Sequence, residues 1–197
     1  MEHALPRKIL LGVTGGIAAY KIPYLVRALV KAGAEVQVVM TPSAHDFVTP
    51  LALATVSKRP VLSELFARDG SGRWNDHVHL ARWADVMLIA PATANTLARF
   101  AAGMADDPVA LAWLTVQGPK LLCPSMNTRM LESPATVRNL ETLRRDGAKI
   151  LSPDDGYLAC GETGAGRLPD PDQILSALAA CFVKKAERSL RILVTTG

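Results

Sequence analysis

Three polar segments of this chain carry side chains that can do chemistry. The first is residues 124–130 (PSMNTRM), which places the amide of Asn127 between two methionines just after an apolar, strand-like run. The others are the histidine-bearing segment 76–79 and the glycine-flanked cysteine loop 159–161. Open α/β sheets bind ligands at the carboxyl ends of their strands. An amide at such an end, with an imidazole and a thiol elsewhere, indicates a reaction as well as a fold.

The elements that must position these groups follow from the apolar pattern. Six short apolar runs are continuous rather than alternating, which is typical of strands covered on both faces. The expected strands are residues 8–13, 35–40, 85–90, 120–123, 149–151 and 191–195. The expected helices are residues 17–32, 93–102, 107–115, 134–146 and 171–186. Strands that alternate with helices predict an α/β fold, with a doubly wound, mainly parallel six-stranded sheet and helices on both faces.

Size and charge narrow the classes of protein. The 197 residues, 49% of them hydrophobic, predict one main domain with a single core. No apolar run reaches the roughly 18–20 residues that span a membrane, so no membrane partner is expected. The net charge of +4 is concentrated in residues 184–191, which contain four basic residues and one acidic residue, Glu187. The rest of the chain is close to neutral, which argues against a nucleic-acid partner.

Cysteine usage predicts a reducing compartment. Cys123, Cys160 and Cys181 are widely spaced and form no CxxC pair. A disulfide framework and a zinc site are therefore both unexpected, no metal is predicted, and the cytoplasm is the expected location.

Two segments bear on domain organisation. Residues 57–75 are rich in glycine and charge, and they are expected to form a mobile loop. The final run, residues 191–197, repeats the pattern of the first strand and its glycine turn. We therefore expect one complete α/β domain at residues 1–186, followed at residues 187–197 by a linker and the start of a second α/β unit that is absent.

The ends of the predicted strands indicate a ligand. Gly15 and Gly16 follow the first strand, where glycine allows close backbone approach and helix N–H groups attract an anion. Thr41 and Ser43 follow the second, where a dinucleotide-binding domain usually has an acidic residue. Thr93 and Asn95 follow the third. Each hydroxyl taken alone is more typical of a helix N-cap. Their recurrence at successive strand ends favours one phosphate and one flat ring, hence FMN over NAD.

These segments together resemble the homo-oligomeric flavin-containing cysteine decarboxylases, and within them the phosphopantothenoylcysteine decarboxylases of coenzyme A biosynthesis. The resemblance runs in order along nearly the whole chain. The matching segments are residues 12–21 (GVTGGIAAYK), 39–50 (VMTPSAHDFVTP), 77–85 (HVHLARWAD), 90–95 (APATAN), 103–107 (GMADD), 124–130 (PSMNTRM) and 159–167 (ACGETGAGR). Residues 188–197 resemble the start of a CTP-dependent ligase domain that follows in bifunctional relatives.

The resemblance implies a flavodoxin-like fold, FMN as cofactor, 4'-phosphopantothenoylcysteine as the small-molecule substrate, and a trimer or larger homo-oligomer with flavin near subunit interfaces. It adds Ile17, Phe47 and Ala92 to the expected FMN contacts. Flavin oxidation at the sulfur-bearing carbon then lets CO₂ leave, and an enethiolate forms that must be protonated and reduced.

The resemblance also assigns roles to the site residues. His77 is the expected base, with His79 as a competing candidate if the segment is extended. Asn127 is expected to bind the reacting carboxylate, and Cys160 to donate a proton from a closing flap. The expected substrate contacts are Asn127, Met130, Ala159, Cys160 and Gly161. Cys123 and Cys181 read as inert.

Departures and alternatives remain at this stage. Leu131 replaces a usual aromatic residue, and Glu162 replaces a usual aspartate. A peptidyl-cysteine decarboxylase would share His77 and the PSMNTRM segment but would not need the Cys160 loop. A flavin prenyltransferase should lack both segments. A non-catalytic, regulatory flavoprotein would commonly have lost His77, Asn127 or Cys160, and all three are present.

Overall fold

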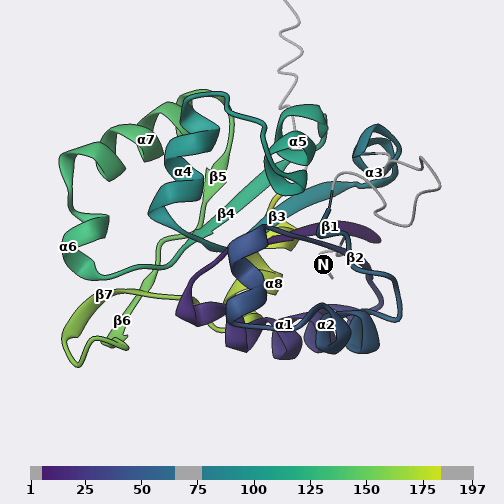
Figure 1. Cartoon of the computed structure of the whole chain (residues 1–197), viewed down its shortest axis with the longest axis horizontal. Coiled ribbons are helices and arrows are strands. Elements are labelled where there is room, and N and C mark those ends of the chain that lie inside the picture. Colours follow the sequence, from purple (N-terminus) through teal and green to yellow (C-terminus); the bar gives the residue numbers. More distant parts are fainter. Residues whose placement is uncertain (1–5, 65–76, 183–197) are drawn as a thin grey trace, which may run out of the picture.

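The architecture is a parallel sheet between two layers of helices. The structure is a computed structural model that describes residues 6–64 and 77–182, and for His77 the backbone alone. Five strands lie in the order β2-β1-β3-β4-β5, and all neighbours are parallel (Figure 1). They are β1 (Lys8–Val13), β2 (Glu35–Met40), β3 (Val86–Ala92), β4 (Lys120–Pro124) and β5 (Lys149–Ile150). This order is that of flavodoxin-like proteins, so the predicted fold class is confirmed.

The sheet has one strand fewer, in the part of the chain that the structure describes, than the six that were predicted. Five strands, not six, form this sheet there, and the predicted strand at residues 191–195 lies outside the described residues. The predicted loop at residues 57–75 also lies largely outside them.

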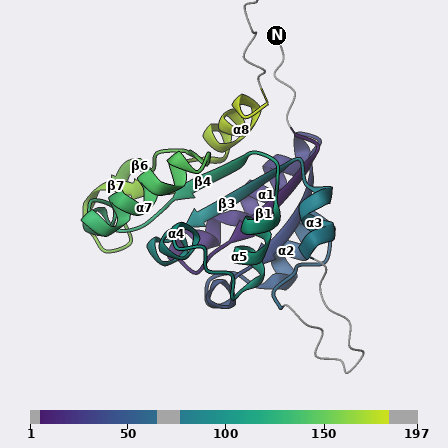
Figure 2. The same cartoon turned by 90° about the horizontal axis from the view of Figure 1, so that it is seen from above.

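Helices cover both faces of the sheet, and successive residues of β1 point to opposite sides. Ile9 and Leu11 are buried against the face that holds α1 (Ile22–Lys31), α2 (Pro50–Ser57) and α8 (Pro171–Ala180). Leu10 is buried against the other face (Figures 1 and 2). That face holds α3 (His77–Trp83), α4 (Ala94–Ala101), α5 (Pro108–Thr115) and α7 (Pro134–Arg145). Among the described helices, none is long and apolar enough to cross a membrane.

Local signals explain where the helices begin and end. The predicted helix at 17–32 is in fact a 3-10 helix, η1 (Ile17–Lys21), followed by α1, whose first turn contains Pro23. Proline has no N–H to donate, and a helix tolerates it in the first turn. α1 ends before Gly33, which takes a φ of 92° that glycine adopts without strain. The Thr93 and Asp107 side chains cap α4 and α5.

Short elements near the strand ends escaped prediction. They are the 3-10 helix η2 (Pro42–Asp46), the helix α6 (Thr128–Leu131), and the antiparallel hairpin of β6 (Asp154–Tyr157) and β7 (Thr163–Arg167). The helices α2 and α3 were not predicted either. The hairpin lies at the β4–β5 side of the sheet, beside α6 (Figures 1 and 2). It carries the cysteine loop at its tip.

Thr14, which follows β1, is hydrogen-bonded to the end of β3. Its fully buried hydroxyl donates to the Pro91 carbonyl at 2.7 Å and accepts from the Thr93 N–H at 3.3 Å. Replacing Thr14 by valine keeps the shape but leaves two backbone groups without these partners. An unsatisfied buried group costs about 1–3 kcal/mol.

We therefore expect Thr14→Val to lower the free energy of unfolding by about 2–3 kcal/mol, measured by urea denaturation. The matched control is Thr55→Val, because the exposed Thr55 hydroxyl bonds only the Leu51 carbonyl within its own helix. The control should stay within about 0.5 kcal/mol of the parent chain. Equal losses in both variants would contradict the role of Thr14.

Candidate active site

The carboxyl ends of β1, β2 and β3 form a cradle edged by hydroxyls and backbone N–H groups. A side chain at Gly15 would collide with Ser43, so glycine is what lets the β1 turn lie against η2. The Thr41 and Ser43 hydroxyl oxygens are 3.3 Å apart. A side chain at Gly16 would press on the methyl group of Thr93, 3.1 Å away. Five of the predicted cofactor residues therefore converge from three strand ends.

The chemistry of this cradle fits FMN. Small hydroxyls and glycine N–H groups are suitable donors to a phosphate. Two predicted contacts, Ile17 and Phe47, expose 56% and 39% of their surface beside it, although both are large apolar side chains. Such exposure at a strand-end crevice suits a flat aromatic ring. Asn95 is exposed on α4, whereas Ala92 is fully buried, so Ala92 can offer a ligand only its backbone.

Asn127 joins the β4 end to the hairpin tip. Its side-chain oxygen accepts the Arg129 N–H at 2.9 Å and caps α6. This bond leaves Nδ2 facing the hairpin, where it lies 3.2 Å from Cys160 Sγ and 3.1 Å from Glu162 Oε2. The Cys160 thiol is 3.7 Å from the same carboxylate oxygen. Asn127 and Cys160, predicted from separate segments, are therefore in direct contact.

The hairpin is fastened to the loop after β4. Met126 N–H and Ser125 Oγ both donate to the Gly166 carbonyl at 3.0 Å. Thr128 Oγ1 donates to the Ala165 carbonyl at 2.8 Å. Any side chain at Gly166 would collide with the Met126 carbonyl, and the φ of Gly166 is 142°. Glycine at 166 is thus a requirement for bringing the cysteine loop to Asn127.

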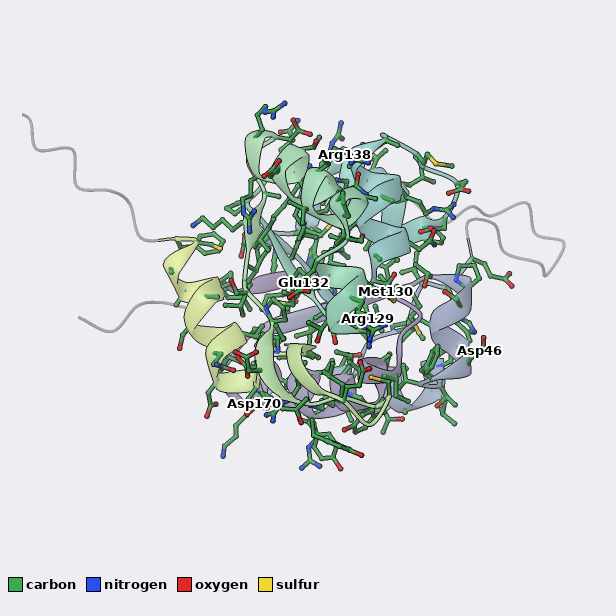
Figure 3. The ribbon with its side chains drawn as sticks, turned by 90° about the vertical axis from the view of Figure 1, so that its left-hand side faces the viewer. Asp46, Arg129, Met130, Glu132, Arg138 and Asp170 are labelled. Atoms are coloured by element: carbon green, nitrogen blue, oxygen red, sulfur yellow. The ribbon has the colours of Figure 1, made fainter. Side chains whose placement is uncertain are left out.

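The remaining substrate candidates surround this contact. Ala159 and Gly161 flank Cys160 at the exposed tip, and Gly161 has a φ of 85°, a conformation that glycine adopts readily. Met130 is 49% exposed on α6, next to Arg129 (Figure 3). Figure 3 also shows Asp46 of η2 on one side of α6 and Asp170, before α8, on the other.

The three cysteines differ in their surroundings. Burial raises the pKa of the Cys123 thiol well above its usual range, and the nearby Cys181 raises it further. Burial also raises the pKa of Cys181, against the opposing charge of Lys149. Both therefore stay protonated and unreactive near neutral pH. Cys160 is exposed, which agrees with its being the functional thiol.

The histidine assignment is not tested by the geometry. His77 begins α3, but its side chain is outside what the structure describes. His79 is exposed on the same helix. His79 competes with His77 only if the segment is extended, because residues two apart share one face of a strand but not of a helix, and the segment is helical. Among the described residues, no cluster of acidic, histidine or cysteine side chains could hold a metal ion.

A cavity of about 260 Å³ opens between η1 and the hairpin. Its lining includes Ile17 from the cradle and Ala159 from the cysteine loop, so it adjoins both parts of the site. Leu131, the departure from the family pattern, lines a different apolar cavity beside α7.

Sequence reasoning missed several residues that build the site. Thr14 and Thr128 act through hydroxyl bonds to distant backbone carbonyls, a role that residue type alone does not reveal. Glu162 was noted only as a substitution, but it shares the Asn127 amide with Cys160. The signal for Gly166 was present, since glycine recurs at positions 161, 164 and 166.

Comparisons with known proteins agree with this geometry. A sequence profile described as Flavoprotein matches residues 2–183. The chain is 43% identical over 197 residues to the coenzyme A biosynthesis bifunctional protein CoaBC of Vibrio vulnificus (strain YJ016), covering 100% of this chain and 49% of that protein. It is 44% identical over 192 residues to CoaBC of Escherichia coli (strain K12), covering 97% and 47%. The chain thus spans about half the length of these curated relatives.

Two solved structures share the fold. One is a PPC decarboxylase with a cysteine-to-serine mutation, complexed with pantothenoylaminoethenethiol. It has a TM-score of 0.77 and 31% identity, covering 88% of this chain and 96% of that one. The other is the FMN binding protein AtHal3, with a TM-score of 0.75 and 32% identity, covering 89% and 96%. This chain belongs to the flavoprotein family.

Proposed function

We propose that the chain catalyses the FMN-dependent decarboxylation of 4'-phosphopantothenoylcysteine to 4'-phosphopantetheine, a carboxy-lyase step of coenzyme A biosynthesis. The observation that carries this proposal is the contact between Asn127 Nδ2 and Cys160 Sγ, at 3.2 Å, beside the strand-end cradle. An amide that can hold a carboxylate then lies next to a thiol that can donate a proton. The CoaBC relatives and the PPC decarboxylase neighbour support the same reaction.

We also propose a division of the chain into two parts, which the length of the same relatives supports. Because these proteins are bifunctional and about twice as long, we assign residues 1–186 to the decarboxylase. Residues 187–197 are then a linker and the start of a ligase domain.

The cradle would hold FMN. Gly15, Gly16, Thr41, Ser43 and Thr93 surround the phosphate position. Ile17, Phe47, Asn95 and the Ala92 backbone complete the site toward the ring. When bound, FMN supplies reversible two-electron oxidation at the carbon that bears sulfur, which is what makes loss of CO₂ feasible. The protein supplies position and proton control.

Asn127 orients the reacting carboxylate. A neutral amide donates a hydrogen bond without the full charge of an arginine, so it can hold the carboxylate and still release it as CO₂. The bond from Arg129 N–H fixes the direction of this amide. His77, by the family resemblance, removes the thiol proton, because imidazole titrates near neutral pH. Cys160 then protonates the enethiolate carbon.

Glu162 adds a competing carboxylate. In this structure its Oε2 takes the Asn127 N–H that the substrate carboxylate needs. The substrate must therefore displace Glu162, and the loss of CO₂ vacates the position again. The return of Glu162 would bring the hairpin tip, and with it Cys160, back to Asn127 for the proton transfer.

A single assay tests the reaction and its proton donors. The chain loaded with FMN should show flavin absorption and convert the substrate with loss of the mass of CO₂. His77→Asn should keep flavin but release no CO₂. Cys160→Ser should release CO₂ but accumulate the unsaturated thiol, as seen by mass spectrometry; the Cys-to-Ser neighbour, complexed with an aminoethenethiol, supports this stage.

The matched control for the thiol is Cys181→Ser, which should give saturated product. Normal product from Cys160→Ser would remove its role as proton donor. A chain that neither contains FMN nor binds it when added would end the proposal as a whole.

Glu162→Gln tests the competition for Asn127. A hydrogen bond to a charged group contributes about 1.5–3 kcal/mol and a neutral one about 0.5–1.5 kcal/mol, so the substitution weakens the competitor. We expect KM for the substrate to fall about fivefold, which corresponds to about 1 kcal/mol. Glu132→Gln, an exposed change at the end of α6, is the control and should leave KM unchanged. An unchanged or higher KM in Glu162→Gln would contradict the competition.

We also propose that the chain assembles as a trimer or larger homo-oligomer. Ile17 and Tyr20 of η1 and Tyr24 of α1 are each more than half exposed, and Leu51 of α2 is 77% exposed. Exposed apolar surface of this kind marks an interaction site. Sedimentation equilibrium of the FMN-loaded chain should give three times the protomer mass or more, and a monomer would refute the assembly.

A further inference from the structure

The cavity between η1 and the hairpin lies beside the residues of the proposed reaction site. Its volume is about 260 Å³. One wall is η1, and the other is the hairpin with the chain that follows it. The lining residues are Ile17, Ala18, Tyr20, Lys21, Ser125, Tyr157, Leu158, Ala159, Gly166, Arg167 and Leu168. Ala159 precedes Cys160, and Ser125 lies two residues before Asn127. A molecule that reacts at Cys160 and Asn127 can therefore extend into this cavity.

The charge of this cavity is positive. Lys21 and Arg167 line it, and none of its lining residues is acidic. Arg167 is already compensated, because its guanidinium bonds both carboxylate oxygens of Asp170 at 3.0 and 3.1 Å. Lys21 is half-buried, and within the described part of the chain it makes no ion pair or hydrogen bond. The cavity thus contains an uncompensated ammonium group.

The rest of the lining matches a saturated chain with polar ends. Ile17, Ala18, Leu158 and Leu168 supply apolar surface, and Tyr20 and Tyr157 carry hydroxyls that can donate to an anion. A short aliphatic arm that ends in a phosphate has this combination of properties. A lysine in a partly apolar pocket is a common point-charge partner for phosphate.

We infer that this cavity binds the phosphorylated end of the substrate, with Lys21 as its principal charge. The inference rests on the proposed function, because it takes the reacting end of the same molecule to lie at Asn127 and Cys160. It predicts that the phosphorylated substrate is preferred over its dephosphorylated form. Lys21 is then a specificity residue and has no part in the chemical step.

The test compares ligands with and without phosphate. Binding of pantothenate 4'-phosphate and of pantothenate to the FMN-loaded 197-residue chain is measured by calorimetry, and KM and kcat for the two cysteine adducts by product formation. The parent chain should prefer the phosphorylated member of each pair. Lys21→Gln should reduce that preference at least tenfold, which corresponds to about 1.4 kcal/mol, while kcat at saturation is retained.

Two further variants control for charge and fold. Lys31→Gln removes an exposed lysine from the last turn of α1 and should leave the preference unchanged. Lys21→Arg retains the charge and should restore most of the preference. An unchanged preference in Lys21→Gln overturns the inference. Loss of flavin from Lys21→Gln also overturns it, since Lys21 would then serve the cofactor.

The two proposals fail in different ways. If the parent chain shows a phosphate preference that depends on Lys21 but decarboxylates neither adduct, the proposed reaction is wrong and the phosphate site stands. If it decarboxylates both adducts and Lys21→Gln does not alter their ratio, the reaction stands and the phosphate site is wrong.

Discussion

The site depends on the fastening of the hairpin to the loop after β4. Three hydrogen bonds, from Ser125, Met126 and Thr128 to the carbonyls of Ala165 and Gly166, hold the two segments together. Each contributes about 0.5–1.5 kcal/mol net to stability. Because an isolated two-stranded hairpin is only marginally stable, these bonds are a large part of what holds the hairpin in place. The backbones can approach this closely only because residue 166 has no side chain. Without this contact, Cys160 and Asn127 would lie on unconnected parts of the surface.

This arrangement divides the work between a rigid part and an exposed part. The strand-end cradle is built on β1, β2 and β3, whose residues are almost all fully buried. Asn127 is fixed by its own capping bond on α6. Residues 159–163, in contrast, are all exposed and have few packing contacts to lose. In the proposed function, the FMN ring is held at the rigid sheet and the Cys160 thiol lies on the exposed hairpin tip, from which it can reach the bound substrate.

Much of the fold was predictable because its sheet is parallel and buried. Runs such as 8–13 and 35–40 match β1 and β2 residue for residue, since a strand covered on both faces must be apolar throughout. The strand ends followed from this pattern, and with them Thr41, Ser43, Thr93 and Asn127. The hairpin was missed for the opposite reason. The sequence TGAGR of β7 has no apolar alternation, because glycine occupies positions 164 and 166. It forms a strand by pairing with β6, and it docks on residues 125–128.

The same limit explains why Glu162 looked like a minor substitution. A sequence pattern reports residue type, but not that the Asn127 amide donates a hydrogen bond to a carboxylate 35 positions away. In the proposed function, Glu162 places its carboxylate at the donor that would bind the substrate carboxylate, and this arrangement has two effects. It keeps the amide satisfied while no substrate is bound, and it makes binding a replacement of one carboxylate by another, so the number of hydrogen bonds at Asn127 is conserved. The free energy for orienting the substrate must then come from elsewhere, and the longer the arm that lies in the cavity beside η1, the more of it that arm can supply.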